Sequence, residues 1–197
     1  MRVGEPGVVA FAFTGQVGED LMSGLGEGLV LARRIFAGVG QSVQTLREPL
    51  LHGLARQLAG ELGKAMAQLF TSEGASVVLG DISGRQDDVA AEINAASGAP
   101  GGNTPRAVAV HCDVSGEDQV KAMIAAAEDT FGRLDILCSN AGFGGGMAAL
   151  ADQSLEQWNR VHDTNIKGAF LCMKYAILSM LRTGGGSIVN TGSASAV

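Results

Sequence analysis

The sequence predicts a doubly wound parallel α/β sheet. Short apolar runs alternate with amphipathic helical segments, a polar residue follows each run, and glycine is abundant, at 29 of 197 residues against a usual share of about 7%. Parallel strands need a crossover connection, usually a helix, so this alternation predicts parallel pairing. Ligands of such sheets bind beyond the carboxyl ends of the strands, which directs attention to those polar residues.

The composition is that of a globular protein and excludes several other classes. The chain is 46% apolar with a net charge of −6, which is too apolar and too weakly charged for disorder. It has 20 acidic and 14 basic residues and no basic cluster, so neither nucleic acid nor an anionic membrane is an expected partner. No stretch reaches the ~18 apolar residues of a membrane span. The three cysteines lack metal spacing, which predicts reduced thiols in a cytoplasmic protein.

The chain divides into two pieces of different texture. Residues 1–60 form an atypical segment in which all basic residues are arginine. Its apolar residues step by three or four, which predicts mainly helical structure; they are Val43, Leu46, Leu50, Leu54 and Leu58. Residues 61–197 carry the regular alternation and are expected to form the sheet domain.

Each element of the second piece follows from an apolar run and its flanking residues. We expect strands over 76–80, 107–110, 134–138 and 187–191. Helices are expected over 87–96, from Ser115 to Phe131 and from Ser154 to about Leu181, with both serines as N-terminal caps. Glycines and prolines over 98–105 predict a loop, and the glycines of 184–186 end the last helix.

Two acids lie at expected strand ends. A carboxylate at Asp81 would accept hydrogen bonds from adenosine ribose hydroxyls and repel a 2′-phosphate, which favours NAD over NADP. An ordinary solvated turn aspartate is the alternative. At Asp113 a carboxylate and a backbone N–H suit an adenine amino group and ring nitrogen. The simpler interpretation there is that Asp113 or Ser115 caps the next helix.

Three further positions offer polar groups near the same edge. Asn140, Ala141 and Gly142 let a cofactor pass close to the backbone, and the asparagine amide can tie strands together or orient the cofactor. A glycine-rich turn without ligand is the alternative. Asn165 is a poor residue for a helix interior, so it is either a buried structural amide or the holder of a helix irregularity and a water. Ser193 could hydrogen-bond a substrate carbonyl or be a turn serine.

Taken together, residues 63–197 resemble the short-chain dehydrogenase/reductase family. The segment DILCSNAG at 135–142 resembles the family's fourth strand, with Ser139 where asparagine is more usual. The segment WNRVHDTNIKGAF at 158–170 resembles the helix of the catalytic asparagine, which maps to Asn165. The segment SIVNTGS at 187–193 resembles the fifth strand and places the catalytic serine at Ser193.

This resemblance implies a Rossmann-like fold and NAD-dependent hydride transfer between a secondary alcohol and a ketone. Ser193 would orient the carbonyl and Asn165 would support a proton relay. The implied cofactor contacts are Gly63, Asp81, Ile82, Asp113, Val114, Asn140, Ala141 and Gly142. Partners would be a small-molecule alcohol or ketone, and the long helix resembles the family's dimer helix, so a homodimer or homotetramer is expected.

The phosphate-binding turn departs from the family pattern. Of the Thr-Gly-x-x-x-Gly-x-Gly glycines only Gly63 fits, since Gln57 and Glu61 occupy the two earlier positions. The apolar stepping from Leu50 to Phe70 continues through this region, and one long helix would bury the N–H groups that a pyrophosphate needs. The alternative is a first strand at 8–13 followed by Thr14-Gly15, with the residues up to Gly63 looped out.

The second departure concerns the catalytic tyrosine. The family's Tyr-x-x-x-Lys follows the catalytic serine, whereas this sequence stops at Val197 and its one tyrosine, Tyr175, is followed by Ser179 at the fourth position. We therefore expect a fold truncated after the fifth family strand, with little or no dehydrogenase activity. An altered or partial gene product is one interpretation. A non-catalytic Rossmann-like nucleotide-binding or subunit-partner module is the alternative, and the Asn-Ala-Gly strand end argues against a methyltransferase.

Overall fold

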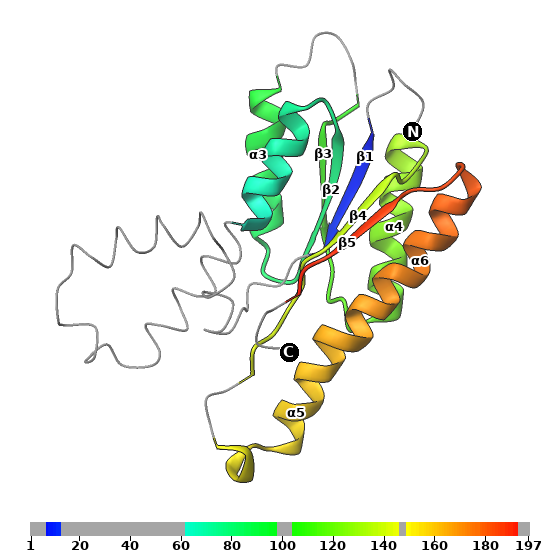
Figure 1. Ribbon diagram of the computed structural model, residues 1–197. Helices are drawn as coiled ribbons and strands as arrows, with labels where there is room; N and C mark the ends of the chain where they lie inside the picture. Colours follow the sequence, from blue (N-terminus) through cyan, green and yellow to red (C-terminus); the bar gives the residue numbers. More distant parts are fainter. Residues whose placement is uncertain (1–6, 13–61, 98–103, 146–148, 193–197) are drawn as a thin grey trace, which may run out of the picture.

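The computed structural model describes residues 7–12, 62–97, 104–145 and 149–192 (Figure 1). Five parallel strands form one sheet in the order β3-β2-β1-β4-β5. Their bounds are Val8–Ala12 for β1, Ser76–Asp81 for β2, Ala107–His111 for β3, Ile136–Ser139 for β4 and Ser187–Asn190 for β5. The predicted parallel α/β sheet is confirmed, and the predicted strands agree with these bounds to within two residues.

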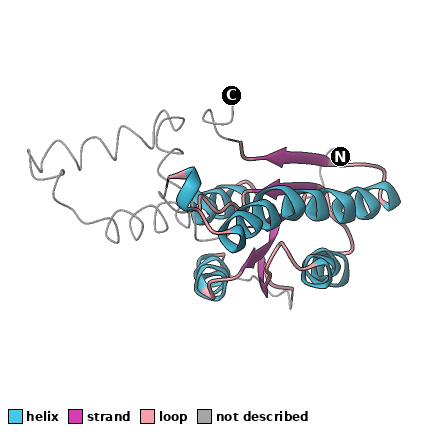
Figure 2. Ribbon diagram, turned by 90° about the horizontal axis from the view of Figure 1, so that it is seen from below, coloured by secondary structure: helices cyan, strands magenta, loops and turns pink. Residues whose placement is uncertain are grey.

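Helices cover both faces of this sheet (Figure 2). A helix over residues 62–72 and α3 (Arg85–Ala96) lie on one face, while α4 (Glu117–Phe131) and α6 (Ala169–Arg182) lie on the other (Figure 1). A short 3₁₀ turn, η3 (Leu150–Asp152), precedes α5 (Leu155–His162). A π-helical segment, η4 (Asp163–Gly168), joins α5 to α6.

The central strand comes from the N-terminal piece of the chain. β1 lies between β2 and β4, so the alternative first strand is confirmed. The sheet therefore contains strands from before and after residue 60. Asp135 fixes it, because its Oδ2 accepts the Val8 N–H at 2.8 Å and its own N–H donates to the Val8 carbonyl at 2.9 Å. The Thr14-Gly15 turn, Gln57, Glu61 and the expected helical structure of the first 60 residues lie in 13–61, outside the described residues.

Alternation along the central strands divides the core into two clusters. Val8, Ala10 and Ala12 face α4 and α6, whereas Val9 faces α3, since successive strand residues point to opposite sides of a sheet. All four are at most 4% exposed. The sheet is therefore apolar on both faces, as expected of a parallel sheet covered by helices.

The two expected serine caps have different outcomes. Ser154 does cap α5, since its Oγ accepts the Gln157 N–H at 3.1 Å. The Ser115 prediction is wrong, because Gly116 occupies the cap position of α4 without a side-chain bond. Ser115 instead donates its N–H to Asp113 Oδ1 at 2.9 Å, which holds it in the preceding turn. Such local side-chain bonds compete with capping.

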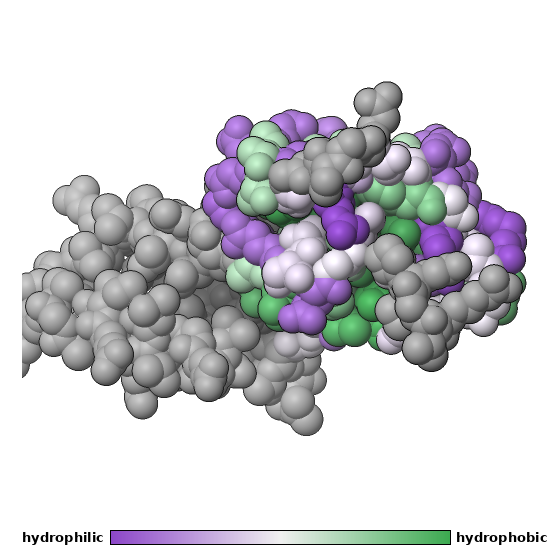
Figure 3. All heavy atoms as spheres, turned by 90° about the horizontal axis from the view of Figure 1, so that it is seen from above, coloured by the Kyte–Doolittle hydropathy of each residue, from purple (hydrophilic) through white to green (hydrophobic). Residues whose placement is uncertain are grey.

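The surface of the described chain is mixed. On the face shown in Figure 3, hydrophobic residues form small areas separated by hydrophilic ones. In the described ranges, the longest apolar helices are too short or too polar to cross a membrane.

Candidate cofactor-binding site

The carboxyl ends of the strands form one edge that carries the predicted polar residues. The register aligns Ala12 with Ser139 and Ser139 with Asn190, and it aligns Asp81 with His111. The residues that follow these strands are therefore neighbours along a single edge of the sheet. Asp81, Asp113 and Asn140 all lie there, as the sequence predicted. Ser193 lies outside the described residues.

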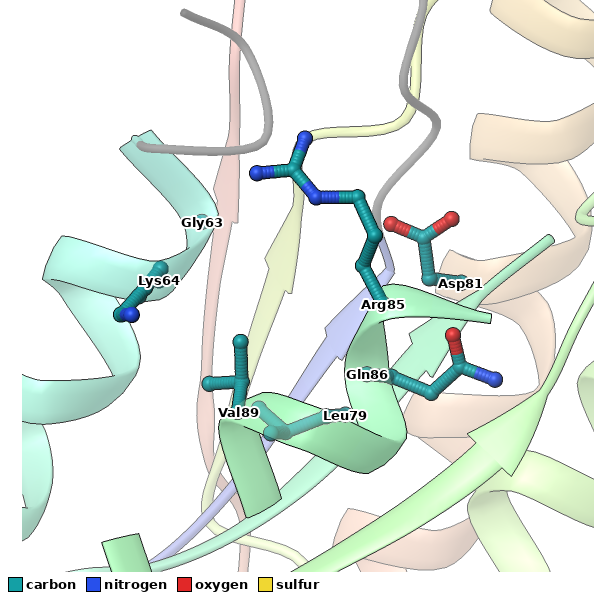
Figure 4. A pocket seen from close by; sticks show the side chains of 7 residues that line it. All are labelled: Gly63, Lys64, Leu79, Asp81, Arg85, Gln86 and Val89. Atoms are coloured by element: carbon teal, nitrogen blue, oxygen red, sulfur yellow. The ribbon is translucent and has the colours of Figure 1, made fainter. Parts of the chain in front are cut away.

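Asp81 ends β2 and lines a pocket between β2, α3 and the helix over 62–72. Its carboxyl group is buried, with the residue 5% exposed, and Oδ1 accepts the Ser83 N–H at 2.7 Å. Figure 4 shows Asp81 on one side of this pocket and Gly63 with Lys64 on the other. The complete lining is Gly63, Lys64, Leu79, Asp81, Arg85, Gln86 and Val89. The structure thus brings two predicted residues, Gly63 and Asp81, to one pocket.

Other residues around this pocket were not expected from the sequence. Lys64 forms an ion pair of 2.6 Å with Glu92 of α3, which joins the helix over 62–72 to α3. Arg85 and Gln86 belong to the first turn of α3. In the sequence they are two polar residues at the start of a helix, and nothing distinguishes them from other polar helix residues. Ile82, a predicted contact, is 43% exposed and follows the strand, next to Asp81 but outside the pocket lining.

The Asp113-Val114 turn follows β3 and is partly engaged by the protein itself. The Asp113 N–H donates to Gln119 Oε1 at 2.8 Å and Asp113 Oδ1 accepts the Ser115 N–H at 2.9 Å. The Val114 side chain is 1% exposed, and a Cβ on Gly168 would lie 2.6 Å from its Cγ2. Within the described ranges, no group accepts a bond from the Val114 N–H.

Cys112 lies between the two acids but offers no reactive thiolate. Burial, followed by the proximity of Cys172, Asp113 and Asp81, raises the pKa of the Cys112 thiol to about 12. Cys138 and Cys172 are also free and buried, and burial raises their pKa values to about 11 and about 12. All three are packed as neutral thiols.

Asn140 ties three strands together at the edge. Its N–H donates to the Ala12 carbonyl at 2.9 Å, which links it to β1. Its side-chain Oδ1 accepts the Thr191 hydroxyl at 2.7 Å, which links it to the residue after β5. The residue is 6% exposed, so its amide is a buried structural group, and the strand-tying interpretation is confirmed.

Asn165 holds the loop that follows β4. Its Oδ1 accepts the Phe143 N–H at 2.7 Å and its Nδ2 donates to the Phe143 carbonyl at 2.9 Å. It lies inside η4, so the expected helix irregularity is confirmed, and its partner is backbone. Asn165 is exposed, so the alternative of a buried structural amide is wrong. π-Helical segments occur frequently at functional sites. Sequence reasoning missed Phe143, whose ring also lies 4.5 Å from the Arg160 guanidinium.

The loop between Asn140 and Gly145 passes close to this asparagine. A Cβ on Gly142 would lie 3.7 Å from Asn165 Oδ1, an ordinary contact distance. Ala141 is partly buried against the α4–α6 cluster. The small side chain at Gly142 therefore lets the backbone pass close to Asn165.

Comparisons with known proteins identify the family. Residues 58–197 match a family model described as enoyl-(acyl carrier protein) reductase. A solved short-chain type dehydrogenase/reductase from Mycobacterium marinum has a TM-score of 0.60 at 34% identity, over 68% of this chain and 51% of that one. The chain belongs to the short-chain dehydrogenase/reductase family.

Curated relatives agree with this assignment. The chain is 39% identical over 137 residues to a 2,5-dichloro-2,5-cyclohexadiene-1,4-diol dehydrogenase of Sphingobium indicum, covering 69% of this chain and 51% of the relative. It is 38% identical to the cis-4-hydroxycyclohexanecarboxylate dehydrogenase of Sinomonas cyclohexanicum, covering 68% and 51%. An NAD-dependent glycerol dehydrogenase of Listeria innocua is 34% identical, with coverage of 71% and 51%. The chain thus spans about half the length of these relatives.

Proposed function

We propose that this protein is an NAD-dependent oxidoreductase that transfers hydride between a secondary alcohol and a ketone, and that the described residues form its cofactor-binding half. One observation carries the proposal: the buried carboxylate of Asp81 shares a pocket with Gly63 at the carboxyl edge of a parallel sheet. Crevices at this edge are where dinucleotides bind in such folds.

NAD is the cofactor that this pocket favours. A carboxylate accepts hydrogen bonds from a free ribose diol, whereas the negative charge of Asp81 opposes a 2′-phosphate. Gly63 keeps the opposite wall small, which suits close approach of a ligand. The nicotinamide, when bound, gives or takes the hydride. The described residues fit the adenosine half of NAD, and this fit supports NAD as the cofactor.

The other residues at the carboxyl edge of the sheet are assigned roles from the hydrogen-bonding groups that they offer. The Val114 N–H suits an adenine ring nitrogen and the Asp113 carboxylate suits the adenine amino group, with Ile82 beside the ring. Asn140, through its three-strand link, and the Asn165–Phe143 clamp keep the loop over β4 in place. Ala141 and Gly142 then line the path of the cofactor.

Two residues are assigned to the reacting end of the site. We assign the carbonyl-orienting role to Ser193 and the support of a proton relay to Asn165. Tyr175, the one tyrosine of the sequence, donates its hydroxyl to Glu117 of α4 and is not the general acid. We expect the chain to bind NAD.

The substrate class is a small secondary alcohol or its ketone. Several relatives are named dehydrogenases of hydroxylated rings or of glycerol, which supports an alcohol substrate. Exposed apolar side chains on α5 and α6, among them Trp158 at 48% and Phe170 at 56%, support the expected homodimer or homotetramer. Light scattering on the purified chain measures the assembly.

Calorimetry tests the cofactor proposal. The chain should bind NADH more tightly than NADPH, and Asp81→Ala should weaken NADH binding and remove the preference. Asp118→Ala is the matched control, because Asp118 is an exposed acid on α4. Equal binding of both nucleotides by the unsubstituted chain would refute the NAD assignment, and absence of binding would favour the non-catalytic partner module instead.

A further inference from the structure

The loop after β4 is held on α5 and η4 by three contacts. Asn165 of η4 bonds both backbone groups of Phe143, at 2.7 Å to the N–H and 2.9 Å to the carbonyl. The Phe143 ring lies beneath Arg160 of α5, whose guanidinium carbon is 4.5 Å from the ring centre. A Cβ on Gly145, where φ is +72°, would lie 3.1 Å from Val161 Cγ2. Residues over 160–165 therefore hold residues 143–145.

The contact between Arg160 and Phe143 joins an exposed charge to a buried ring. Arg160 is exposed, whereas Phe143 is 8% exposed. A guanidinium over an aromatic face is attracted by the negative charge of that face, and its flat shape suits stacking. Asn165 fixes the main chain of Phe143, and Arg160 fixes its ring. The two contacts together set both the position and the orientation of this residue.

The order of the strands places this loop across the crevice from Asp81. The chain leaves β1 on one side through β2 and β3, and it continues on the other side through β4 and β5. Ligands of such sheets bind where the order reverses, here between β1 and β4. Asp81 ends β2, and residues 140–145 follow β4. A dinucleotide with its adenosine at Asp81 therefore has its nicotinamide half beside the loop after β4.

The helix that carries Arg160 is well placed to support that loop. Figure 1 shows α5 extending from α6 past the carboxyl ends of β4 and β5. We propose that Arg160 is a positioning residue, which acts through the Phe143 ring to hold the loop after β4 where the nicotinamide half of the cofactor lies against it. The assignment rests on the proposed function. It predicts that Arg160 affects ligands that reach the β4 side and leaves unaffected those that end at the Asp81 pocket.

Calorimetry with a long and a short nucleotide tests this prediction. NADH and ADP are titrated into the full chain, into Arg160→Met and into Arg160→Lys. Methionine keeps an unbranched apolar chain over the ring and removes the charge. Arg160→Met should bind NADH about two- to fivefold more weakly, which is the worth of an exposed contact between a cation and a ring, and should bind ADP as before. Arg160→Lys keeps a cation, so its affinity for NADH should lie between the two.

A double substitution shows whether Arg160 acts through Phe143. Phe143→Leu removes the ring and should weaken NADH binding by a similar factor. Adding Arg160→Met to Phe143→Leu should then change the affinity no further, because both substitutions break the same contact. Without nucleotide, hydrogen exchange at the Phe143 amide should quicken in Arg160→Met. Losses that add in the double variant would overturn the assignment.

A matched control separates positioning from general stability. Arg182→Met removes another exposed arginine, in the last turn of α6, which pairs with Glu128, and it should bind both nucleotides like the unsubstituted chain. If Arg160→Met weakens NADH and ADP binding equally, its role is structural and the assignment is overturned. If that variant does not fold, Phe143→Leu decides by the same comparison of NADH with ADP.

The remaining outcomes are distinct. If the unsubstituted chain binds neither nucleotide, the proposed function is wrong and this inference is wrong with it. If the unsubstituted chain binds both and Arg160→Met binds NADH as tightly as Arg182→Met does, the role of Arg160 alone is overturned.

Discussion

The two edge strands of the sheet differ in how they are covered. β3 is packed by α3 and α4, and its first residue, Ala107, is 2% exposed. β5 pairs with β4, but Val189 is 52% exposed, and Figure 2 shows β5 at the margin of the described chain. The β3 side of the sheet is thus enclosed by the protein's own helices, whereas the β5 side presents apolar surface.

This difference indicates which part of the fold contributes most to stability and which part of the site is held by buried elements. The Asp81 pocket is built on β2 and α3, which belong to the enclosed side. The loop after β4 depends on a clamp from η4 on the open side. We expect substitutions in the enclosed centre to reduce stability strongly, and substitutions on the open side to change local order or surface properties.

The largest effect is expected at Asp135, which fixes the central strand. Arg133 donates to its Oδ1 at 2.6 Å and the Val8 N–H donates to its Oδ2 at 2.8 Å. Asp135→Ala removes the carboxylate that binds the Arg133 guanidinium and leaves the buried Val8 N–H without its acceptor, so the free energy of unfolding should fall by about 3–5 kcal/mol. Asp118→Ala breaks an exposed pair with Lys121 and should cost about 1 kcal/mol or less. Urea unfolding measures both, and similar losses would contradict the account.

The next test compares one buried leucine with one exposed leucine. Leu137 of β4 is 0% exposed and Leu181 of α6 is 71% exposed. Leu137→Ala should lower the free energy of unfolding by about 2–5 kcal/mol, whereas Leu181→Ala should change it by no more than about 0.5 kcal/mol. A large loss for Leu181→Ala would show that the open side is covered in solution, and light scattering would then identify a second copy as the cover.

A smaller effect is expected from two asparagines that bind backbone groups, one beside β3 and the other beside the loop after β4. Asn94 holds the start of β3, where its Oδ1 accepts the Ala107 N–H at 2.9 Å. Asn165 holds Phe143 through two bonds. Either Asn→Leu variant should lose about 1–3 kcal/mol. Hydrogen exchange should quicken at Ala107 in the first and at Phe143 in the second, and a uniform change over both regions would argue against two separate clamps.

The smallest effect concerns pH and the contact between α4 and α6. Hydrogen bonds from Tyr175 and Lys174 lower the pKa of Glu117 below its usual 4.5. A carboxyl whose folded pKa is depressed stabilises the protein above the unfolded value and loses that contribution as the pH falls through the folded value. Glu117→Gln should therefore be slightly less stable at neutral pH, and the difference should vanish at acid pH. A difference that grows below pH 4.5 would contradict this assignment.

Most of the fold could be predicted because strand and helix periods are local. The runs ending at Asp81 and Ser139 needed no distant information, and Ser154 behaves as its position suggests. β1 could be offered only as an alternative, because its place between β2 and β4 depends on Asp135, far along the chain. The Ser115 cap failed for a local reason, since the Asp113 carboxylate takes the Ser115 N–H.

The candidate site was predicted where it depends on strand ends and missed where it depends on packing. Asp81 ends a strand and Asn140 follows one, so their edge could be anticipated. Phe143 is held by backbone atoms, which no side-chain pattern records. Gln86 appears in the sequence as one more polar residue on a helix, and only its burial distinguishes it.

The central claim is that a dinucleotide binds at the carboxyl edge of this sheet, with its adenosine ribose at Asp81. Titration of the ¹⁵N-labelled chain with NAD tests it directly. The account predicts that the amide signals of Ser83, Val114 and Gly142 shift together, while those of Glu73 and Gly132, at the opposite ends of the strands, stay unchanged. Shifts confined to that opposite edge, or no shifts at saturating NAD, would contradict it.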